Sequence, residues 1–180
     1  GSSLADVKCY LRVAGIMAEY SQPGDMMVVS AAGSTTNQLI NWLKLSQSDR
    51  LSAHQVQQTL RRYHSDLISG LLPPESAEPL IAEFIQDLER LAVLLDGKAD
   101  EVCYAEVVGH GEIWSARLMA AVLNHLDMQA AWLDARDFLR AERAAQPQVD
   151  EGRSYPLLQQ LLAQHPGKRL VVTGFISRNE

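Results

Sequence analysis

The sequence is poor in the residues that build disulfide frameworks and metal centres. Its two cysteines, Cys9 and Cys103, stand alone in the chain, without CxxC spacing and without a paired histidine. A disulfide framework or a zinc site therefore has little support, and both residues are predicted to be buried thiols. The five histidines are scattered singly, and no HxxxH or HExxH pattern occurs. We expect no metal site built by this chain.

Long apolar runs and an excess of positive charge are also missing. No apolar run approaches the ~20 residues that span a bilayer, and the first residues lack the basic start of a signal peptide. The formal net charge is -6 and the sequence pI is about 5.3. Nucleic acids and anionic membranes select basic faces, so the charge argues against both as partners. A cytoplasmic protein with no nucleic-acid and no membrane partner is expected.

What the sequence does contain is the length and composition of one globular domain. It has 180 residues, of which 47% are hydrophobic and 21% are charged, which is enough for one full core. Three short apolar runs, at Met26 to Ser30, Gln129 to Leu133 and Arg169 to Ile176, are typical of strands that are buried on both faces. The intervening patterns are helical. These features predict a three-layer α/β/α sandwich with one mainly parallel sheet.

Helical periodicity fills most of the remaining sequence. Apolar spacing predicts a first helix from about Leu4 to Tyr20. Between about residues 36 and 126 the pattern is nearly all helical, which is too long for a simple crossover between strands. We therefore expect a helical excursion beside the sheet that forms a wall of the site. Two shorter helices are predicted over about residues 135–141 and 157–164.

A loop of small residues follows the first predicted strand. The side chains from Ser30 to Ser34 have little bulk, so a ligand could approach the backbone, and Thr35 and Thr36 add hydroxyl groups. Ligands of open α/β sheets bind at the carboxyl ends of strands, and helix N-termini favour anions. The loop is therefore the expected site of a small anionic substrate. A tight turn with a Ser or Thr N-cap explains the same residues equally well.

Two glycines flank His110 inside a predicted helix over about residues 101–125. Each interior glycine costs a helix about 1 kcal/mol relative to alanine, so Gly109 and Gly111 predict a local break or a close backbone approach. A break would place Glu112 in the first turn of a new helix, where the helix dipole favours a carboxylate. His110 has no triad partner nearby and is interpreted as a turn residue that bonds the backbone.

Five segments, in order along the chain, resemble the aspartate kinases of the amino acid kinase family. Gly1–Ser3 resembles the end of the family's Lys-Phe-Gly-Gly-(Thr/Ser)-Ser motif, although an expression-tag scar has the same residues. The other four segments are similar to the family's substrate loop, its His-Gly-Glu helix start, its aromatic-(Leu/Phe)-Asp-x-Arg segment and its Gly-Phe-Ile strand end; they are residues 28–37, 109–115, 132–136 and 170–176. The sequence looks most like the kinase part of the bifunctional aspartokinase/homoserine dehydrogenases of the methionine branch.

The resemblance implies ATP-dependent phosphorylation of the β-carboxylate of L-aspartate to 4-phospho-L-aspartate. It also implies that Ser30, Thr36 and Glu112 hold aspartate and that Phe175 lies beside it. Gly1 and Ser2 would then contact the transferring phosphate. Because the acceptor is already a nucleophile, such a reaction depends on positioning and on neutralising phosphoryl charge rather than on a general base.

The resemblance further implies that residues 1–180 are the aspartate-binding half of a kinase domain. The motif lysine would precede residue 1, and the nucleotide-binding half would follow residue 180. ATP and Mg²⁺ would need that second half, and NADP would serve only a dehydrogenase part further downstream. We expect the complete protein to be a homo-oligomer and the 180-residue chain alone to be inactive. The alternatives are a stand-alone α/β module that binds a small molecule, or a kinase that acts on another amino acid.

Overall fold

The computed structural model describes residues 2–97, 100–141, 148–174 and 178–179. Its main sheet has three parallel strands, β1 (Met26–Val29), β2 (Ala130–Leu133) and β4 (Arg169–Thr173), in the order β1-β4-β2. The strand that comes last in the chain thus lies in the middle. The prediction that the three apolar runs share one parallel sheet is confirmed, although the expected end of the third run at Ile176 lies outside the described residues.

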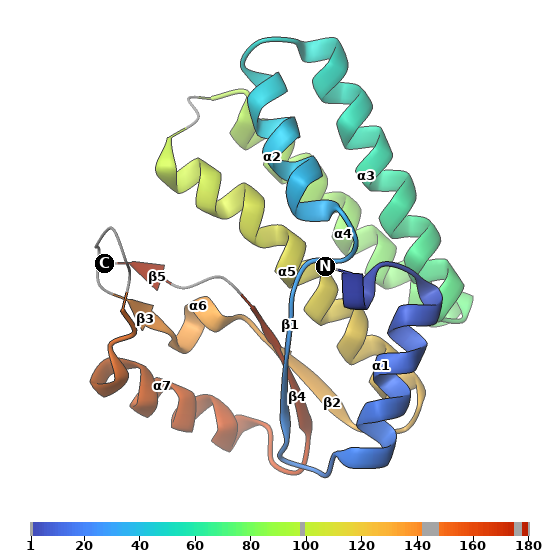
Figure 1. The fold of residues 1–180 in the computed structure, drawn as a ribbon, viewed down its shortest axis with the longest axis vertical. Coiled ribbons are helices and arrows are strands. Elements are labelled where there is room, and N and C mark those ends of the chain that lie inside the picture. The colour runs from blue at the N-terminus through green and yellow to red at the C-terminus, as the bar shows by residue number, and fades with distance from the viewer. Residues whose placement is uncertain (1, 98–99, 142–147, 175–177, 180) are drawn as a thin grey trace.

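Helices cover both faces of this sheet, which gives the predicted three layers (Figure 1). On one face lie α1 (Val7–Tyr20) and α5 (Glu101–His125), and on the other lies α7 (Glu151–Gln164). Successive side chains of a strand point to opposite faces, so β2 and β4 supply residues to the cores on both faces. The α5 side buries Val29, Ala130 and Val171, and the α7 side buries Leu133, Leu170 and Val172.

The expectation that the first strand is buried on both faces is wrong. Met26 and Val28 are 49% and 70% exposed, whereas Val29 is only 3% exposed. The reason is the strand order, since β1 is an edge strand. The residues packed with α7 come from β2, β4 and the segment after β2, so the α7-side face of β1 is left open.

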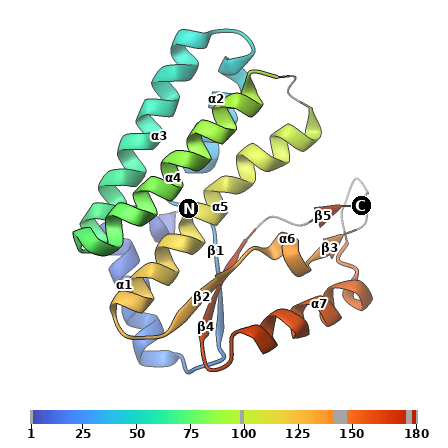
Figure 2. The same ribbon diagram turned by 180° about the vertical axis from the view of Figure 1, so that it is seen from behind.

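The predicted helical excursion consists of α2 (Thr35–Ser46), α3 (Arg50–Leu71) and α4 (Pro74–Leu95), which lead into α5 (Figure 2). Local sequence fixes where these helices begin. The side chain of Asp49 accepts the N–H of Ser52 at the start of α3. Pro74 occupies the first position of α4, where a missing N–H costs nothing.

The first helix begins later than its periodicity suggests. A short 3₁₀ turn, η1 (Ser2–Leu4), comes first, and α1 begins at Val7 rather than Leu4. The N-cap is Asp6, whose extended backbone and side-chain bond to the N–H of Cys9 stop the helix from reaching further back.

The last third of the chain also differs from the predicted bounds. The helix expected over 135–141 covers only Ala135–Phe138 (α6), and it is followed by β3 (Arg140–Ala141), which pairs in parallel with β5 (Arg178–Asn179). The helix expected to begin at 157 begins at Glu151. Its N-cap Asp150 accepts the N–H of Arg153. This capping hydrogen bond allows the helix to begin there although the surrounding residues are charged.

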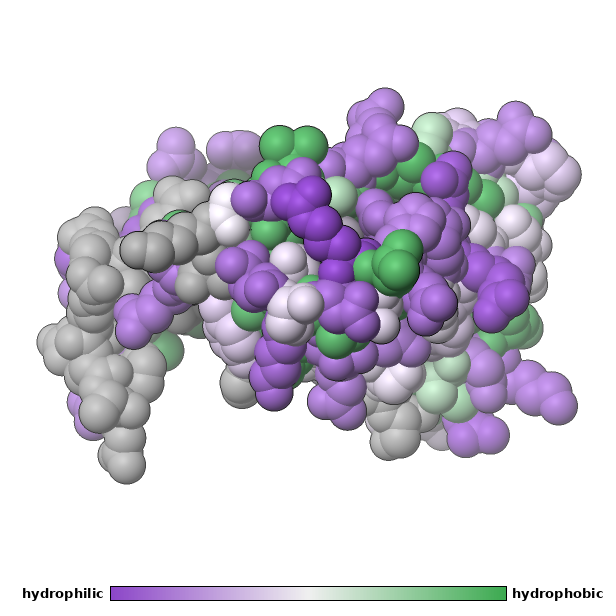
Figure 3. Space-filling model, turned by 90° about the horizontal axis from the view of Figure 1, so that it is seen from above, coloured by the Kyte–Doolittle hydropathy of each residue, from purple (hydrophilic) through white to green (hydrophobic). Residues whose placement is uncertain are grey.

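No helix in the described part of the chain is long and apolar enough to span a membrane. Seen from above, the molecule presents a mainly hydrophilic face with scattered hydrophobic residues (Figure 3). Cys103 is buried as expected, and burial raises the pKa of its thiol, but the prediction that Cys9 is buried is wrong, since Cys9 is only half-buried.

Candidate functional site

The helix α5 runs without a break through Gly109, His110 and Gly111. The predicted local break is therefore wrong, and Glu112 does not begin a new helix. All residues from Val107 to Ala116 are buried, so α5 is a central helix that is packed on every side. Such packing stabilises a helix more than propensity does, which explains why two glycines do not interrupt it.

The alternative to a helix break, a close backbone approach to a neighbouring segment, occurs at Gly111. A Cβ at this position would lie 2.8 Å from the Cβ of Ala31 and 3.4 Å from Cγ2 of Thr35. A side chain is thus excluded by the loop that joins β1 to α2. The same approach brings the next residue, Glu112, against that loop.

Glu112 is a carboxylate buried at this contact. The residue is only 4% exposed, and its Oε2 has no hydrogen-bond partner among the described residues. Burial raises the pKa of the carboxyl, and the opposing contribution comes chiefly from the backbone N–H of Ala31, which donates to it. An unpaired oxygen of a buried carboxylate costs free energy. A cationic group of a ligand would remove that cost.

The β1–α2 loop carries the two other predicted substrate ligands. Ser30 directly follows β1 and is exposed, and Thr36 lies in the first turn of α2 and is half-buried. Gly33 has a φ of +51°, in the left-handed region that favours glycine. The competing interpretation as a side-chain N-cap is not realised, because Ser34 makes no capping hydrogen bond and instead accepts one from the side chain of Gln38.

The carboxyl ends of β1 and β4 meet beside the same loop. The N–H of Gly174 donates to the carbonyl oxygen of Val29 at 2.7 Å, and a Cβ on Gly174 would lie 2.9 Å from that oxygen. Thr173 is buried, and its Oγ1 accepts the N–H of Ala135 at 2.8 Å, which fixes the start of α6 to the end of β4.

The structure thus brings Glu112 together with the loop that carries Ser30 and Thr36, at the carboxyl end of the sheet. Two of the other residues predicted for the site, Phe175 and Gly1, lie outside the described residues. Ser2 is described only in its backbone, as part of η1.

His110 is a buried structural residue. Its Nε2 lies 2.6 Å from Nη2 of Arg90, and its Nδ1 lies 2.6 Å from the carbonyl oxygen of Glu106. A guanidinium only donates, so Nε2 accepts and Nδ1 carries the proton. Burial lowers the pKa of His110, which favours this neutral form. The expectation that His110 bonds the backbone is confirmed, but it does so inside a helix and not in a turn.

A second buried histidine, which the sequence analysis did not select, reaches the β1–α2 loop. His64 of α3 is 2% exposed, and its Nε2 lies 3.0 Å from Oγ1 of Thr35. The rings of Tyr63, Phe84 and Trp114 surround it, with centroid distances of 5.0, 4.9 and 5.1 Å. Burial lowers the pKa of His64 to about 3. Helical periodicity alone places this residue on an inward face but does not indicate its partner.

The depressed pKa of His64 makes the stability of the chain depend on pH. The unfolded residue binds a proton at about pH 6.5 and the folded one only at about pH 3, so stability is complete above 6.5 and is lost as the pH falls through this window. The expected slope is up to ~1.4 kcal/mol per pH unit. Urea unfolding at several pH values should show a shallower slope for His64→Gln than for the parent, with His125→Gln at an exposed position as the matched control. Equal slopes for His64→Gln and the parent would contradict the assignment.

An ion-pair network joins the helices that surround this site. Asp87 of α4 accepts from Nη1 of Arg117 at 2.7 Å, from Nε1 of Trp114 at 3.1 Å and from Nη2 of Arg90 at 3.3 Å. Asp87 and Arg117 have little exposed side chain, 12% and 17%. The Asp87–Arg117 pair therefore lies between α4 and α5, whereas the side chain of Arg90 is 56% exposed.

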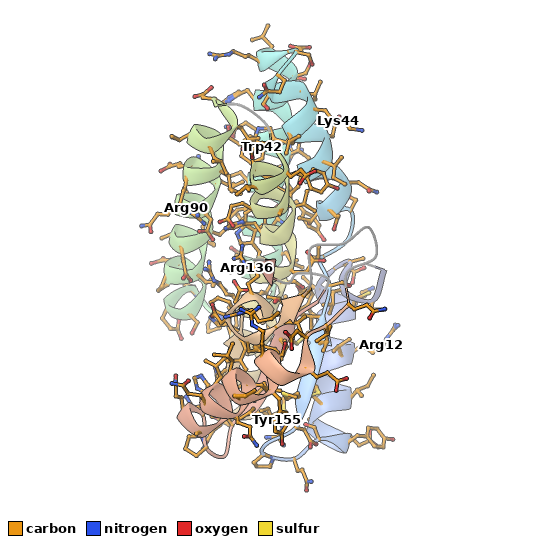
Figure 4. The ribbon with its side chains drawn as sticks, turned by 90° about the vertical axis from the view of Figure 1, so that its left-hand side faces the viewer. Arg12, Trp42, Lys44, Arg90, Arg136 and Tyr155 are labelled. Atoms are coloured by element: carbon orange, nitrogen blue, oxygen red, sulfur yellow. The ribbon has the colours of Figure 1, made fainter. Side chains whose placement is uncertain are left out.

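Arg136 extends the network to α6. It bridges two carboxylates, with Nη2 at 2.7 Å from Asp134 and Nη1 at 2.6 Å from Glu106 of α5. Figure 4 shows Arg136 where the helical part of the molecule meets the sheet. The Asp-x-Arg spacing is part of the family resemblance, but the partner of Arg136 on α5 is 30 positions away, and no local pattern indicates it.

Comparison with known proteins decides the family. The model of the amino acid kinase family matches residues 1–180. This chain belongs to the amino acid kinase family. The resemblance drawn from five short segments is therefore confirmed over the whole chain.

Within the amino acid kinase family, several curated relatives are bifunctional enzymes. The chain is 83% identical over 179 residues to bifunctional aspartokinase/homoserine dehydrogenase 2 of Escherichia coli K12, which covers 99% of this chain and 22% of that protein. It is 28% identical over 172 residues to the chloroplastic bifunctional aspartokinase/homoserine dehydrogenase 1 of Arabidopsis thaliana, covering 92% and 19%. The chain thus spans about a fifth of the length of these relatives.

Solved structures of aspartokinases share the fold. E. coli aspartokinase III in complex with aspartate and ADP matches with a TM-score of 0.84 and 23% identity, over 100% of this chain and 40% of that chain. Its complex with lysine and aspartate matches with a TM-score of 0.83 over 99% and 40%. The aspartate kinase of Clostridium acetobutylicum matches with a TM-score of 0.73 and 19% identity, over 99% and 38%.

Proposed function

We propose that this chain is the aspartate-binding half of a kinase domain that transfers the γ-phosphoryl group of ATP to the β-carboxylate of L-aspartate. The observation that carries the proposal is Glu112, a buried carboxylate with an unpartnered oxygen that is pressed against a loop of small residues. The 83% identity to an aspartokinase of E. coli supports the same substrate. The product would be 4-phospho-L-aspartate.

The proposed binding mode assigns one chemical task to each group. Glu112 accepts a charge-assisted hydrogen bond from the α-ammonium group of aspartate, which pairs the otherwise unsatisfied oxygen. Ser30 and Thr36 offer hydroxyl donors to the carboxylates, and Phe175 lies beside the substrate. The result is an aspartate held in one orientation, so that its β-carboxylate attacks phosphorus without help from a general base.

The phosphoryl side of the reaction is proposed to depend on residues outside this part of the chain. Among the described residues, no three His, Cys, Asp or Glu side chains are grouped so that they could hold a metal ion. Mg²⁺ bound with ATP would neutralise phosphate charge. Gly1 and Ser2 are proposed to contact the transferring phosphate.

The proposal extends to the complete protein. We infer that it also carries a homoserine dehydrogenase part, as the name of the E. coli relative suggests. NADP is proposed as the cofactor of that part. A cytoplasmic location and a homo-oligomeric state stay predictions, to be checked by fractionation and by light scattering of the complete protein.

Substrate-dependent ADP release tests the proposed function. The complete protein should release ADP only when ATP and L-aspartate are both present, and hydroxylamine should trap the acyl phosphate as the hydroxamate. The 180-residue chain alone should release none, because phosphoryl transfer depends on electrostatic stabilisation from the other half. Turnover of glutamate or acetylglutamate in place of aspartate would assign another substrate. Aspartate binding without any turnover by the complete protein would favour the stand-alone binding module.

A further inference from the structure

We propose that two consecutive residues of α3, Tyr63 and His64, are positioning residues that hold the β1–α2 loop in the shape that binds the amino-acid substrate. The inference rests on the proposed function, because it concerns the same site. Neither residue is assigned a contact with the substrate. They act on the loop through Gly33 and Thr35.

The contact between His64 and Thr35 fixes the start of α2. Thr35 is fully buried at 0% exposure, and its Oγ1 shares a hydrogen bond of 3.0 Å with Nε2 of His64. Its methyl group faces the opposite side, since Cγ2 is 3.4 Å from where a Cβ of Gly111 would lie. Thr35 is thus held between α3 and α5. Its neighbour Thr36 and the neighbour of Gly111, Glu112, are two of the proposed ligands of aspartate.

The imidazole ring of His64 is itself held in place. Three aromatic rings pack around it, those of Tyr63, Phe84 and Trp114, from α3, α4 and α5. Phe84 and Trp114 also pack edge to face against each other, with a centroid distance of 4.8 Å. Aromatic pairs of this geometry are favourable and restrict ring rotation. The hydrogen bond to Thr35 therefore involves an imidazole ring in a fixed position. Through this bond, the position of α3 determines the position of the loop.

Tyr63 holds a second point of the loop. Its hydroxyl donates to the carbonyl oxygen of Ala5 at 2.9 Å, and it lies 2.6 Å from where a Cβ of Gly33 would stand. Gly33 is the loop residue with positive φ. Tyr63 therefore packs against the loop at its residue of positive φ and links the loop to the segment that follows Gly1 and Ser2, the proposed phosphate contacts.

The polar pair of Thr35 and His64 suggests a role beyond stability. Replacing both partners of a buried hydrogen bond by apolar groups of similar shape can be nearly neutral for stability. The threonine–histidine pair lies in an otherwise apolar and aromatic environment. Its hydrogen bond fixes one relative geometry of the two side chains, whereas apolar packing allows several. Positioning and stability can therefore be separated experimentally.

Steady-state kinetics of the complete protein tests the inference with a double-mutant cycle of Thr35→Val and His64→Phe. Each single variant should raise the KM for aspartate by about 3- to 10-fold, the worth of one neutral hydrogen bond, and leave the KM for ATP unchanged. The double variant should be no worse than the worse single variant, because both remove the same bond. His64→Gln, whose amide can reach Thr35, should restore most of the parent's KM. Tyr63→Phe should also raise the KM for aspartate.

Control variants distinguish a positioning role from a loss of fold stability. His54 lies on the same helix and is exposed, so His54→Gln should match the parent. Aspartate KM values within twofold of the parent, with a lowered unfolding temperature, would reduce Tyr63 and His64 to structural roles. Equal rises in both KM values would overturn the inference as well. The parent protein is assayed first: if it phosphorylates a different amino acid, the proposed function fails, and the same cycle is measured with that acceptor.

Discussion

Replacement of Glu112 by glutamine in the complete protein is expected to lower kcat/KM for aspartate by roughly 10- to 150-fold and to leave the KM for ATP nearly unchanged. The change preserves shape but removes the charge that would pair with the substrate ammonium. A hydrogen bond to a charged group is worth about 1.5 to 3 kcal/mol, which gives this range. Steady-state kinetics with either substrate varied is the measurement.

The same substitution should make the folded chain more stable at neutral pH. Burial raises the pKa of Glu112, so the folded state favours the neutral form and loses stability as the pH rises above the usual range of a glutamate. Glutamine is neutral at every pH and avoids this penalty. A residue that improves stability when it is neutralised and impairs activity is typical of a binding site.

A matched control is available on the same helix. Glu101 is exposed in the first turn of α5, so Glu101→Gln should leave kinetics unchanged and cost stability slightly through the helix dipole. Because α5 is continuous, the dipole no longer offers an explanation for Glu112. An aspartate kcat/KM within about twofold of the parent for Glu112→Gln would return that residue to a structural role.

The sheet could be predicted from the sequence because each strand is a short apolar run of its own. The strand order could not, since the pairing of Met26 with Leu170 joins residues from opposite ends of the chain. The exposure of Val28 follows from that order, because only the edge position leaves its face uncovered. The break near Gly111 was predicted from helix propensity alone. Burial on every side of α5 outweighs that propensity, and the glycine serves close packing against the loop.

The site was only partly predictable for a similar reason. The loop after β1 and Glu112 were identified from small residues, spacing and family resemblance. The residues that hold them are distant in sequence, since His64 is 29 positions from Thr35 and Asp87 is 30 positions from Arg117. No local pattern indicates such pairs. They form only when α3, α4 and α5 pack together.

Replacement of Asp87 by alanine should lower the free energy of unfolding of the chain by about 3 to 5 kcal/mol, because it leaves buried cationic and polar groups without their partner. Asp87 accepts three hydrogen bonds, from Arg90, Trp114 and Arg117. Arg117 is the group most affected. Its guanidinium also lies 4.9 Å from the ring centroid of Trp132 on β2 and cannot turn to solvent without leaving that contact.

An exposed ion pair at the end of the same helix shows how much burial contributes. Asp96 lies 3.5 Å from Arg50, with side chains 72% and 84% exposed, so Asp96→Ala should cost less than about 1 kcal/mol. Urea unfolding of both variants gives the comparison. Asp87→Asn should fall between them, because it keeps an acceptor for Trp114 but loses the charge that pairs with Arg117. Equal losses for Asp87→Ala and Asp96→Ala would mean that water or a rearranged Glu83, which lies 3.6 Å from Arg117, replaces the buried partner. Glu83 is 51% exposed and lies farther from Arg117 than Asp87 does, at 3.6 Å against 2.7 Å, so we expect it not to compensate for the buried carboxylate and the loss for Asp87→Ala to be the larger.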